Sequence, residues 1–423
     1  MNKYVKYFCL SVLFYVYSCQ NSEELAVQNV DTNYVSIEEA ILIAETQSPP
    51  LKNVNGKFFG KRKVKKAFPI KTAEENPSMY IINYESDGFV IVAGDNRISP
   101  ILAYSDKNSF PTETTDLPEG LITWMKYMDQ SLKGIRSEKK AQNADLKKVW
   151  LSSNHVNMLY NSNSSRLSTK TNKGRVPSYT DYTYEGDCNN GDARTMVFYN
   201  VGPLTETQWG QGEGYNEFII AMGCSDRSNG RPLTGCVATA VAQVMKYHEY
   251  PSGYDWSQMY NYQGTSETSR LMRNLGFSNN LDMNYGCSSS SADRHNIGRT
   301  FSNMGYPSTN FGSYNYGTVK YEIAYGRPVI LCGSEKAEFL IFGSKSGHCW
   351  VVDGVGEIEY YECIPDPNTP GEVMSHLIST NGYLHMNWGW SGSYNGNYSN
   401  GNFNPGGNSY NWKPDMVTNI RNP

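Results

Sequence analysis

Two stretches in the first third of the chain place apolar residues at the spacing of one helix face. The first, 36–44, opens with Ser-Ile-Glu-Glu, a capping box in which the serine and the second glutamate can satisfy each other's backbone N–H groups. The second runs from Leu121 to Leu132 and carries large apolar and aromatic side chains on its stripe. The pattern therefore predicts two amphipathic helices that each bury one face.

Two short apolar runs lie between these helices. Residues 79–84 and 89–93 are rich in Ile, Val and aromatic residues, and they flank Ser86-Asp87-Gly88, which is typical of a hairpin turn. Helices and hairpin together predict a separate α+β unit over about residues 33–135. The stretch 136–195 is polar, and we expect it to be an exposed linker that a protease can cut.

The start of the chain has the pattern of an export signal. Lys3 and Lys6 precede a short apolar run, 7–16, that is too short to span a bilayer as a mature helix. The run leads into Val16-Tyr17-Ser18-Cys19, which resembles a bacterial lipobox. Residues 1–19 are therefore predicted to be a signal peptide, of the lipoprotein type if Cys19 is acylated and otherwise of the ordinary secretory type.

The composition agrees with a globular protein outside the cytoplasm. Roughly 400 residues remain after the signal, enough for two or three domains. A formal net charge of −4 gives no reason to expect a nucleic-acid partner. The cysteines lack the CxxC spacing of zinc sites, so we expect no metal or other cofactor. Six of them can form disulfides in an oxidising compartment, with fifteen possible pairings: Cys188, Cys224, Cys287, Cys332, Cys349 and Cys363.

Cys236 stands where a turn passes into an apolar helix. Unpaired N–H groups and the positive end of the helix dipole would stabilise a thiolate there and lower the thiol pKa toward neutrality. The helix is apolar nearly all round, so it should be buried. A lone cysteine on such a helix is more often a packed core residue, so other residues must decide between the two interpretations.

Three further segments supply what cysteine acyl-transfer chemistry needs. Gln211 precedes Cys236, while His348 and Asn387 follow it, each beside glycine or tryptophan. A papain-type mechanism pairs the cysteine with a histidine, orients the imidazole with an asparagine, and binds the oxyanion with a glutamine amide and the backbone N–H of the nucleophile. Four such residues in this order are stronger evidence than any one of them.

Three residues offer alternatives. His248 would lie about 18 Å from Cys236 along the same helix, too far to act as the base. His385 could reach the site by strand parity. Asp353 could orient the base, as in a transglutaminase-like acyl transferase, but its parity should turn it to the other strand face. A catalytically silent inhibitor or adhesin is the alternative from another class.

The sequence resembles the streptopain family of papain-like cysteine peptidases from about residue 200 to the end. The resemblance rests on Thr-Gly-Cys-Val-Ala-Thr-Ala around the cysteine, on Gly-His and Asn-Trp-Gly-Trp, and on the stretches 243–251 and 282–286. It implies a nucleophile, a base, an orienting amide, a shielding ring and an oxyanion donor, which fall respectively on Cys236, His348, Asn387, Trp388 and Gln211.

The N-terminal unit resembles the Spi-type inhibitory pro-domain of the same family, through 88–92 and 101–106. The resemblance implies an α+β protein: a pro-domain over 20–135, a linker with the activation cut over 136–195, and over 196–423 a papain-like domain whose central helix packs on an antiparallel sheet. It further implies a zymogen of a cysteine endopeptidase. Its partners would be protein or peptide substrates and its own pro-domain.

Two segments are less well defined by the resemblance. An insertion around Cys363 separates the strands that carry the histidine and the asparagine, and it leaves the walls of the substrate cleft undetermined. Residues 395–409, rich in Gly and Asn, are expected to form a flexible rim loop. Localisation is expected to be extracytoplasmic, either secreted after processing or attached to a membrane through Cys19.

Overall fold

The computed structural model divides into two compact units, Met1–Thr32 and Asn33–Pro423. The described residues are 32–47, 62–71, 76–112, 117–139, 141–151, 159–161, 179–185, 195–333, 348–400, 402–403, 410–411 and 414–423. The predicted signal peptide with Cys19 lies outside them, as does part of the predicted linker 136–195. The described part of that linker contains α3 (Ala144–Leu151), β5 (Leu159–Asn161) and β6 (Tyr179–Glu185), elements that the sequence did not predict. Within the described ranges no helix is both long enough and apolar enough to cross a bilayer.

A large antiparallel sheet passes through both halves of the second unit. Its order is β1-β2-β3-β4-β12-β11-β10-β7-β6-β5, with β9 also on β10 and β15 on both β9 and β8. The bounds are β1 Val64–Ile70, β2 Met79–Tyr84, β3 Phe89–Ala93, β4 Ile101–Ser105, β5 Leu159–Asn161, β6 Tyr179–Glu185, β7 Thr195–Val201, β8 Asn310–Ser313, β9 Val329–Gly333, β10 His348–Pro365, β11 Val373–Asn387, β12 Gly396–Ser399 and β15 Asp415–Thr418. A separate pair joins β13 Asn402–Phe403 to β14 Tyr410–Asn411.

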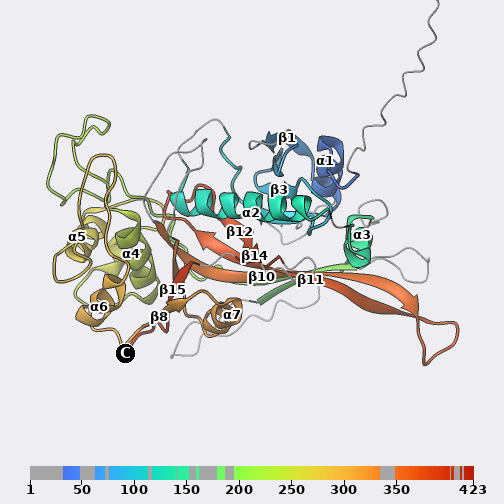
Figure 1. The fold of residues 1–423 in the computed structure, drawn as a ribbon. Helices are drawn as coiled ribbons and strands as arrows, with labels where there is room; N and C mark the ends of the chain where they lie inside the picture. Colours follow the sequence, from blue (N-terminus) through green and yellow to red (C-terminus); the bar gives the residue numbers. More distant parts are fainter. Residues whose placement is uncertain are drawn as a thin grey trace, which may run out of the picture. The chain divides into compact units, whose positions relative to one another are not determined.

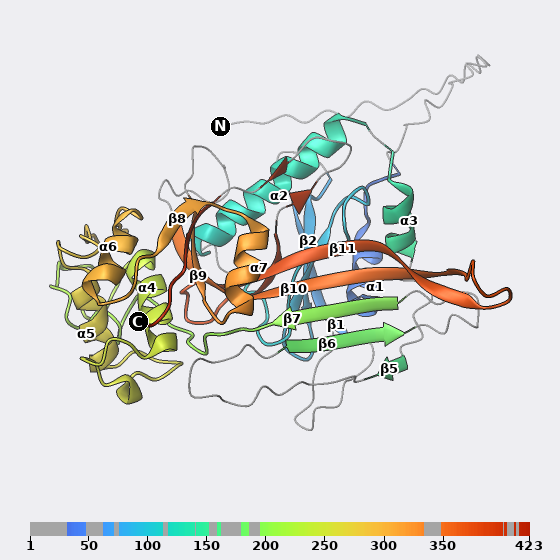
Figure 2. The same cartoon turned by 90° about the horizontal axis from the view of Figure 1, so that it is seen from below.

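Helices cover this sheet and form a cluster at one end of it. They are α1 Ile37–Thr46, α2 Glu119–Ser137, α3 Ala144–Leu151, α4 Cys236–His248, α5 Ser266–Leu275, α6 Asn296–Asn303, α7 Tyr316–Ala324 and a 3-10 turn, Trp256–Gln258. Figures 1 and 2 show α4, α5 and α6 together at one end, while α2 lies along the sheet. The described residues thus have the predicted α+β class, with a buried central helix, α4, packed on β10.

The predicted elements of the N-terminal half are present. The capping box of α1 forms in full: the N–H of Glu39 donates to Ser36 Oγ at 3.1 Å, and the N–H of Ser36 donates to the Glu39 carboxylate at 2.9 Å. Strands β2 and β3 make the expected hairpin. The apolar stripe of α2 is buried against residues of β10, β11 and β12, and Trp124 Nε1 donates to the Ser399 carbonyl at 3.1 Å.

Strand β12 contradicts the prediction of a flexible loop over 395–409, at least for Gly396–Ser399. This strand pairs with β11 on one side and with β4 on the other, so it joins the sheets of the two halves. The ring of Tyr398 is fully buried and supplies the packing energy that a surface loop would lack. Gly396 is required by the approach of β4, because a Cβ there would lie 2.8 Å from the Tyr104 carbonyl oxygen.

The insertion around Cys363 forms the outer part of the β10/β11 hairpin. Figure 2 shows these two strands continuing past the ends of their neighbours. A bulge between Tyr360 and Tyr361 shifts the register of the pair. Lys148 of α3 forms a salt bridge with Glu362 at 2.7 Å, which ties the hairpin to the N-terminal half.

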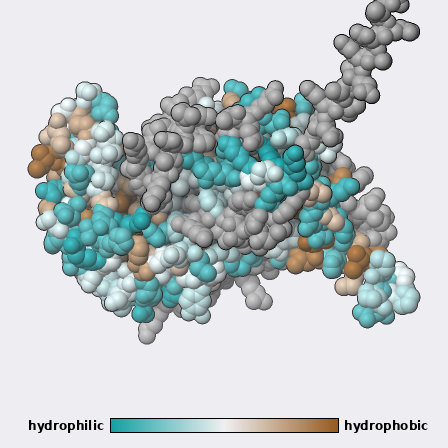
Figure 3. All heavy atoms as spheres, viewed as in Figure 1, coloured by the Kyte–Doolittle hydropathy of each residue, from teal (hydrophilic) through white to brown (hydrophobic). Residues whose placement is uncertain are grey.

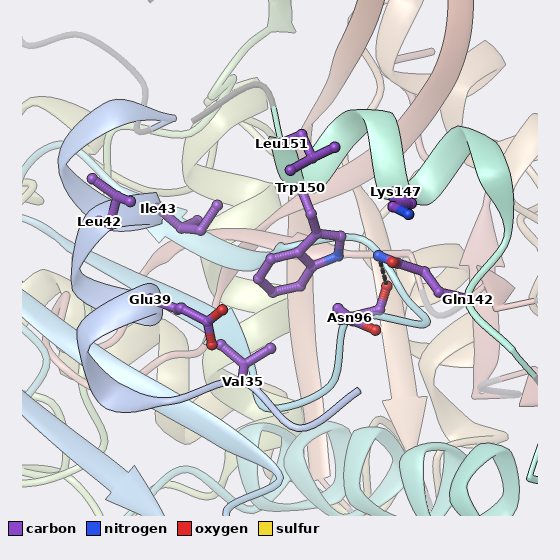
Figure 4. A pocket seen from close by; sticks show the side chains of 9 residues that line it. All are labelled: Val35, Glu39, Leu42, Ile43, Asn96, Gln142, Lys147, Trp150 and Leu151. Carbon is purple, nitrogen blue, oxygen red and sulfur yellow. Dashed lines mark hydrogen bonds between the residues drawn. The ribbon is translucent and has the colours of Figure 1, made fainter. Parts of the chain in front are cut away.

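A cavity of about 300 Å³ lies between α1 and α3. Figure 4 shows the Trp150 indole in its centre, with the hydrogen bond from Gln142 Nε2 to the Asn96 carbonyl beside it. Its lining residues all belong to the N-terminal half: Val35, Glu39, Leu42, Ile43, Asn96, Gln142, Lys147, Trp150 and Leu151. The cavity therefore contains none of the predicted catalytic residues.

Candidate active site

Cys236 is the first residue of α4, as the sequence predicts. It follows Gly235, whose φ of 88° is in the left-handed region that favours glycine. A Cβ on Gly235 would also lie 2.4 Å from Met283 Cε, so the turn has no room for a side chain. The thiol of Cys236 is free, and its sulfur accepts the backbone N–H of Cys349 at 3.5 Å. This contact places the sulfur beside the first residues of β10.

His348, the first residue of β10, is 2% exposed. Its ring stacks on Trp350, with centroids 5.9 Å apart and an interplanar angle of 12°, and it makes a T-shaped contact with Trp390, with centroids 6.2 Å apart. Its Nε2 lies 3.1 Å from the backbone carbonyl oxygen of Trp388. The imidazole is therefore held between tryptophan rings, and one nitrogen is fixed by a main-chain acceptor.

Asn387 is placed differently from the sequence prediction that its side chain orients the base. Its Nδ2 donates to the Thr207 carbonyl at 2.6 Å and approaches Thr205 Oγ1 at 3.4 Å, while its Oδ1 accepts the N–H of Gly389 at 3.3 Å. The Trp388 carbonyl meets the imidazole instead. Asn387 is the last residue of β11, and the next residues of the motif approach the imidazole with the Trp388 carbonyl and the Trp390 ring.

Gln211 lies one loop away from the nucleophile and is tied to it through the main chain. Its carbonyl accepts the N–H of Thr234 at 2.9 Å, immediately before Gly235 and Cys236. Gln211 is 9% exposed, and its Nε2 is buried with no hydrogen-bond partner among the described residues. A buried amide donor without an acceptor is costly, and it is what an oxyanion hole presents before the substrate arrives.

The N-terminus of α2 lies directly on this site, which the sequence did not reveal. A Cβ on Gly120 would lie 2.7 Å from the Trp350 ring, 2.8 Å from the Trp388 ring and 2.9 Å from His348 Cδ2. The preceding residue, Glu119, is near enough to Cys236 for its charge to act on the thiol. The only local signal in the sequence is a glycine at the second position of a helix.

The electrostatics of the covered site oppose an ion pair between Cys236 and His348. Loss of water raises the pKa of Cys236 to about 11, and the Glu119 carboxylate adds to the rise while the Cys349 N–H opposes it. Burial lowers the pKa of His348 to about 4, against the opposing effect of the Trp388 carbonyl. The expected lowering of the thiol pKa by the helix dipole is therefore overcome by desolvation in this state.

Two disulfides among the described residues brace the site. Cys332 and Cys349 face each other across β9 and β10 and are joined, so Cys349 has the structural role that the sequence predicted for it. Cys224 is joined to Cys287, which links the loop after Gln211 to the segment near Cys236. The described residues contain no group of three or more side chains arranged to bind a metal ion.

Asp353 and His385 are hydrogen-bonded to each other, whereas the sequence offered them only as alternatives for the orienting residue and for the base. Their Oδ1 and Nδ1 atoms lie 2.6 Å apart, and the other carboxylate oxygen accepts both the N–H of Thr205, at 3.2 Å, and its hydroxyl. Asp353 is thus engaged away from His348, as its parity indicated. Nothing in this geometry favours the transglutaminase-like alternative.

Comparisons with known proteins match two families along the chain. Residues 32–132 match the Spi protease inhibitor model, and residues 209–262 and 252–398 match the model of the peptidase C10 family. Streptopain from Streptococcus pyogenes serotype M1 is 24% identical over 78% of this chain and 75% of its own length. A thiol protease/hemagglutinin, PrtT, from Porphyromonas gingivalis is 23% identical over 82% of this chain and 38% of its own length.

Among solved structures, a fragment of Prevotella intermedia prointerpain A covers 85% of this chain and 99% of its own, with a TM-score of 0.49 and 19% identity. The active interpain A cysteine protease covers 52% of this chain and 94% of its own, with a TM-score of 0.38 and 25% identity.

The site has a thiol at the start of a helix, a buried imidazole beside it, and a helix of the inhibitor-like region that covers them. These features and the family match define the class: a cysteine endopeptidase that carries its own inhibitory domain. Within that class, residues 209–398 match the peptidase C10 family and the residues before them match the Spi protease inhibitor.

Proposed function

We propose that Cys236 is the nucleophile of this endopeptidase and that His348 is its general base and acid. The observation that carries the proposal is the 3.5 Å contact between the Cys349 N–H and the Cys236 sulfur, because it holds the thiol at the residue next to the imidazole. The Trp388 carbonyl, rather than the Asn387 amide, would fix the orientation of the imidazole. Trp388 also shields the ring from water, in keeping with its full burial.

The reaction follows from these positions. The Cys236 thiolate attacks the carbonyl carbon of a peptide bond, so a carbon–sulfur bond forms and the carbonyl oxygen takes the negative charge. The buried Gln211 amide and the Cys236 N–H would donate hydrogen bonds to that oxygen. His348 then protonates the leaving amine, and water activated by the same imidazole hydrolyses the thioester.

The full chain is proposed to be latent because α2 occupies the catalytic site. Gly120 packs against His348 and the two tryptophan rings, and burial of the thiol, with a smaller contribution from the Glu119 carboxylate, raises the thiol pKa and keeps the thiol protonated. With a thiol pKa near 11 and an imidazole pKa near 4, both groups are neutral at pH 7. Departure of α2 would admit water and remove the carboxylate, which would favour the thiolate–imidazolium pair.

The remaining parts of the proposal rest on sequence. Residues 1–19 would direct export, with Cys19 as the site of a lipid anchor, and the chain would be cut between Lys170 and Arg194, in the linker 136–195 that separates the domains 20–135 and 196–423. Substrates would be proteins or peptides. Mass spectrometry of the active species tests the cut: an active enzyme that keeps residues 20–150 covalently attached would contradict it.

The catalytic assignment is tested with Cys236→Ala and Cys236→Ser, which remove the nucleophile with little change in volume. Both variants should fold and should lose peptide hydrolysis completely after the pro-domain has been cut in trans by wild-type enzyme. Ser302→Ala, at an exposed position of α6, is a control that removes a side-chain hydroxyl away from the site and should leave the chemistry intact. A folded Cys236→Ala protein that still cleaved peptides would refute the mechanism.

A further inference from the structure

The segment 205–211, which ends in Gln211, is held by buried amides that belong to other parts of the catalytic domain. One of them is Gln243, about two turns beyond Cys236 on α4 and fully buried. Its Oε1 accepts two hydrogen bonds from the segment: the Thr207 hydroxyl at 3.0 Å and the Trp209 N–H at 3.3 Å. The helix that begins at Cys236 is therefore hydrogen-bonded directly to the segment that carries the proposed oxyanion donor.

The second amide is Asn387, which approaches the same segment from β11. Its Nδ2 donates to the Thr207 carbonyl at 2.6 Å, so Thr207 is bound by its hydroxyl to α4 and by its carbonyl to β11. Two residues earlier in the chain, Thr205 donates to the Asp353 carboxylate, which in turn is hydrogen-bonded to His385. These contacts form a continuous buried network from the nucleophile helix to the strands of the base.

Main-chain hydrogen bonds extend this network from Thr207 to Gln211. The Trp209 carbonyl accepts the N–H of Ser391 at 3.2 Å, and the Gln211 carbonyl accepts the N–H of Thr234 at 2.9 Å. Gly210 lies between these two residues, and a Cβ there would lie 2.4 Å from Ser391 Oγ, so the backbone of the segment packs closely against Ser391. An oxyanion donor must be placed within a few tenths of an ångström, and this backbone has little freedom to drift.

We propose that Gln243 and Asn387 are positioning residues of the oxyanion hole: they hold Thr207 and Trp209 so that the Gln211 amide points at the developing oxyanion. This inference rests on the proposed role of Gln211. Neither residue touches the reacting atoms. It also gives Asn387 a different task from orientation of the imidazole, which the Trp388 carbonyl performs.

The test compares two reactions of the same thiol. Peptide hydrolysis develops an oxyanion, whereas alkylation by iodoacetamide is a substitution at a saturated carbon and develops none. Gln243→Met keeps the side-chain volume but removes the acceptor. In the full chain activated in trans by wild-type enzyme, we expect kcat to fall by about 10- to 100-fold, toward the loss caused by removal of one oxyanion donor. KM and the rate of alkylation should change by less than about twofold.

Three further variants make the test specific. Gln243→Glu retains an acceptor oxygen and should recover most of kcat. Thr207→Val removes the hydroxyl donor from the other side of the same hydrogen bond and replaces Gln243→Met if that variant does not fold. In the Gln211→Ala background, the addition of Gln243→Met should lower kcat by less than about a further twofold, because the donor that Gln243 positions is already absent.

The outcomes separate this inference from the proposed function. If Gln211→Ala lowers kcat but Gln243→Met and Thr207→Val do not, or if the two losses multiply in the double variant, the positioning role is wrong and the oxyanion role of Gln211 stands. A parallel fall in alkylation would also overturn it, since the network would then act on the thiol. If Gln211→Ala itself leaves kcat unchanged, the proposed role of Gln211 fails, and this inference with it.

Discussion

Gly120 of α2 packs against His348, and we expect Gly120→Ala to weaken the latency of the uncut chain. The added methyl carbon would stand 2.7 to 2.9 Å from atoms of Trp350, Trp388 and His348. Real Cβ contacts are not that short, and the two indoles are fully buried and cannot move aside at low cost. The helix must therefore shift away from the site.

The size of the effect follows from the cost of overpacking. Insertion of a methyl group into a well-packed site costs about 1–3 kcal/mol. The higher helix propensity of alanine applies to α2 whether or not it is docked, so it cancels from the docking equilibrium. The fraction of molecules with an open site should therefore rise by about 5- to 150-fold.

The assay is the rate of Cys236 alkylation in the uncut chain, together with the initial rate of hydrolysis of a fluorogenic peptide before any cleavage is visible on a gel. Gln130→Ala, an exposed position on the same helix, is the control and should behave as wild type. If a folded Gly120→Ala chain is alkylated as slowly as wild type, the close packing of Gly120 is not what keeps the enzyme latent.

Three other outcomes are expected. In the uncut chain, alkylation of Cys236 should rise toward pH 11, because the neutral thiol is favoured up to that pKa, whereas the activated enzyme should react near neutrality; a plateau below pH 7 in the uncut chain would argue against burial as the cause. The free energy of unfolding should fall as the pH drops from about 6.5 to 4, since His348 is buried neutral and the unfolded chain binds the proton first; His348→Ala should lose this part of the pH dependence in urea titrations. Asn387→Ala should lower kcat less than His348→Ala does, because the base and its carbonyl partner remain; equal losses would show that Asn387 is indispensable to the base.

The local elements were predictable because each is encoded by contiguous residues. The capping box at Ser36, the hairpin at Gly88 and the position of Cys236 at the start of α4 all depend on short-range signals, and the structure has them where the sequence places them. The order of Gln211, Cys236 and His348 was also readable. In each case the prediction needed only the type of a residue and the sequence immediately around it.

The parts that were missed depend on contacts between distant segments. The hydrogen-bond partner of the Asn387 amide could not be read from its motif, because that partner, the Thr207 carbonyl, belongs to a segment far earlier in the chain. The placement of Gly120 on His348 depends on how one domain packs on another. Gly396–Ser399 looked like a loop by composition, and only its partners on two sides make it a strand. Tertiary context outweighs local propensity at such sites.

The pairing of β12 with β4 has a consequence for the released enzyme. In the intact chain, Tyr104 and Ala103 give Asn397 and Tyr398 their backbone partners. If the proposed cut frees the N-terminal domain, β12 would become an edge strand with unpaired N–H and C=O groups, a template for an extended chain of suitable register. The freed domain carries the strand that matches this edge, so it would act as an inhibitor in trans, and dilution as well as cleavage would set the amount of free enzyme.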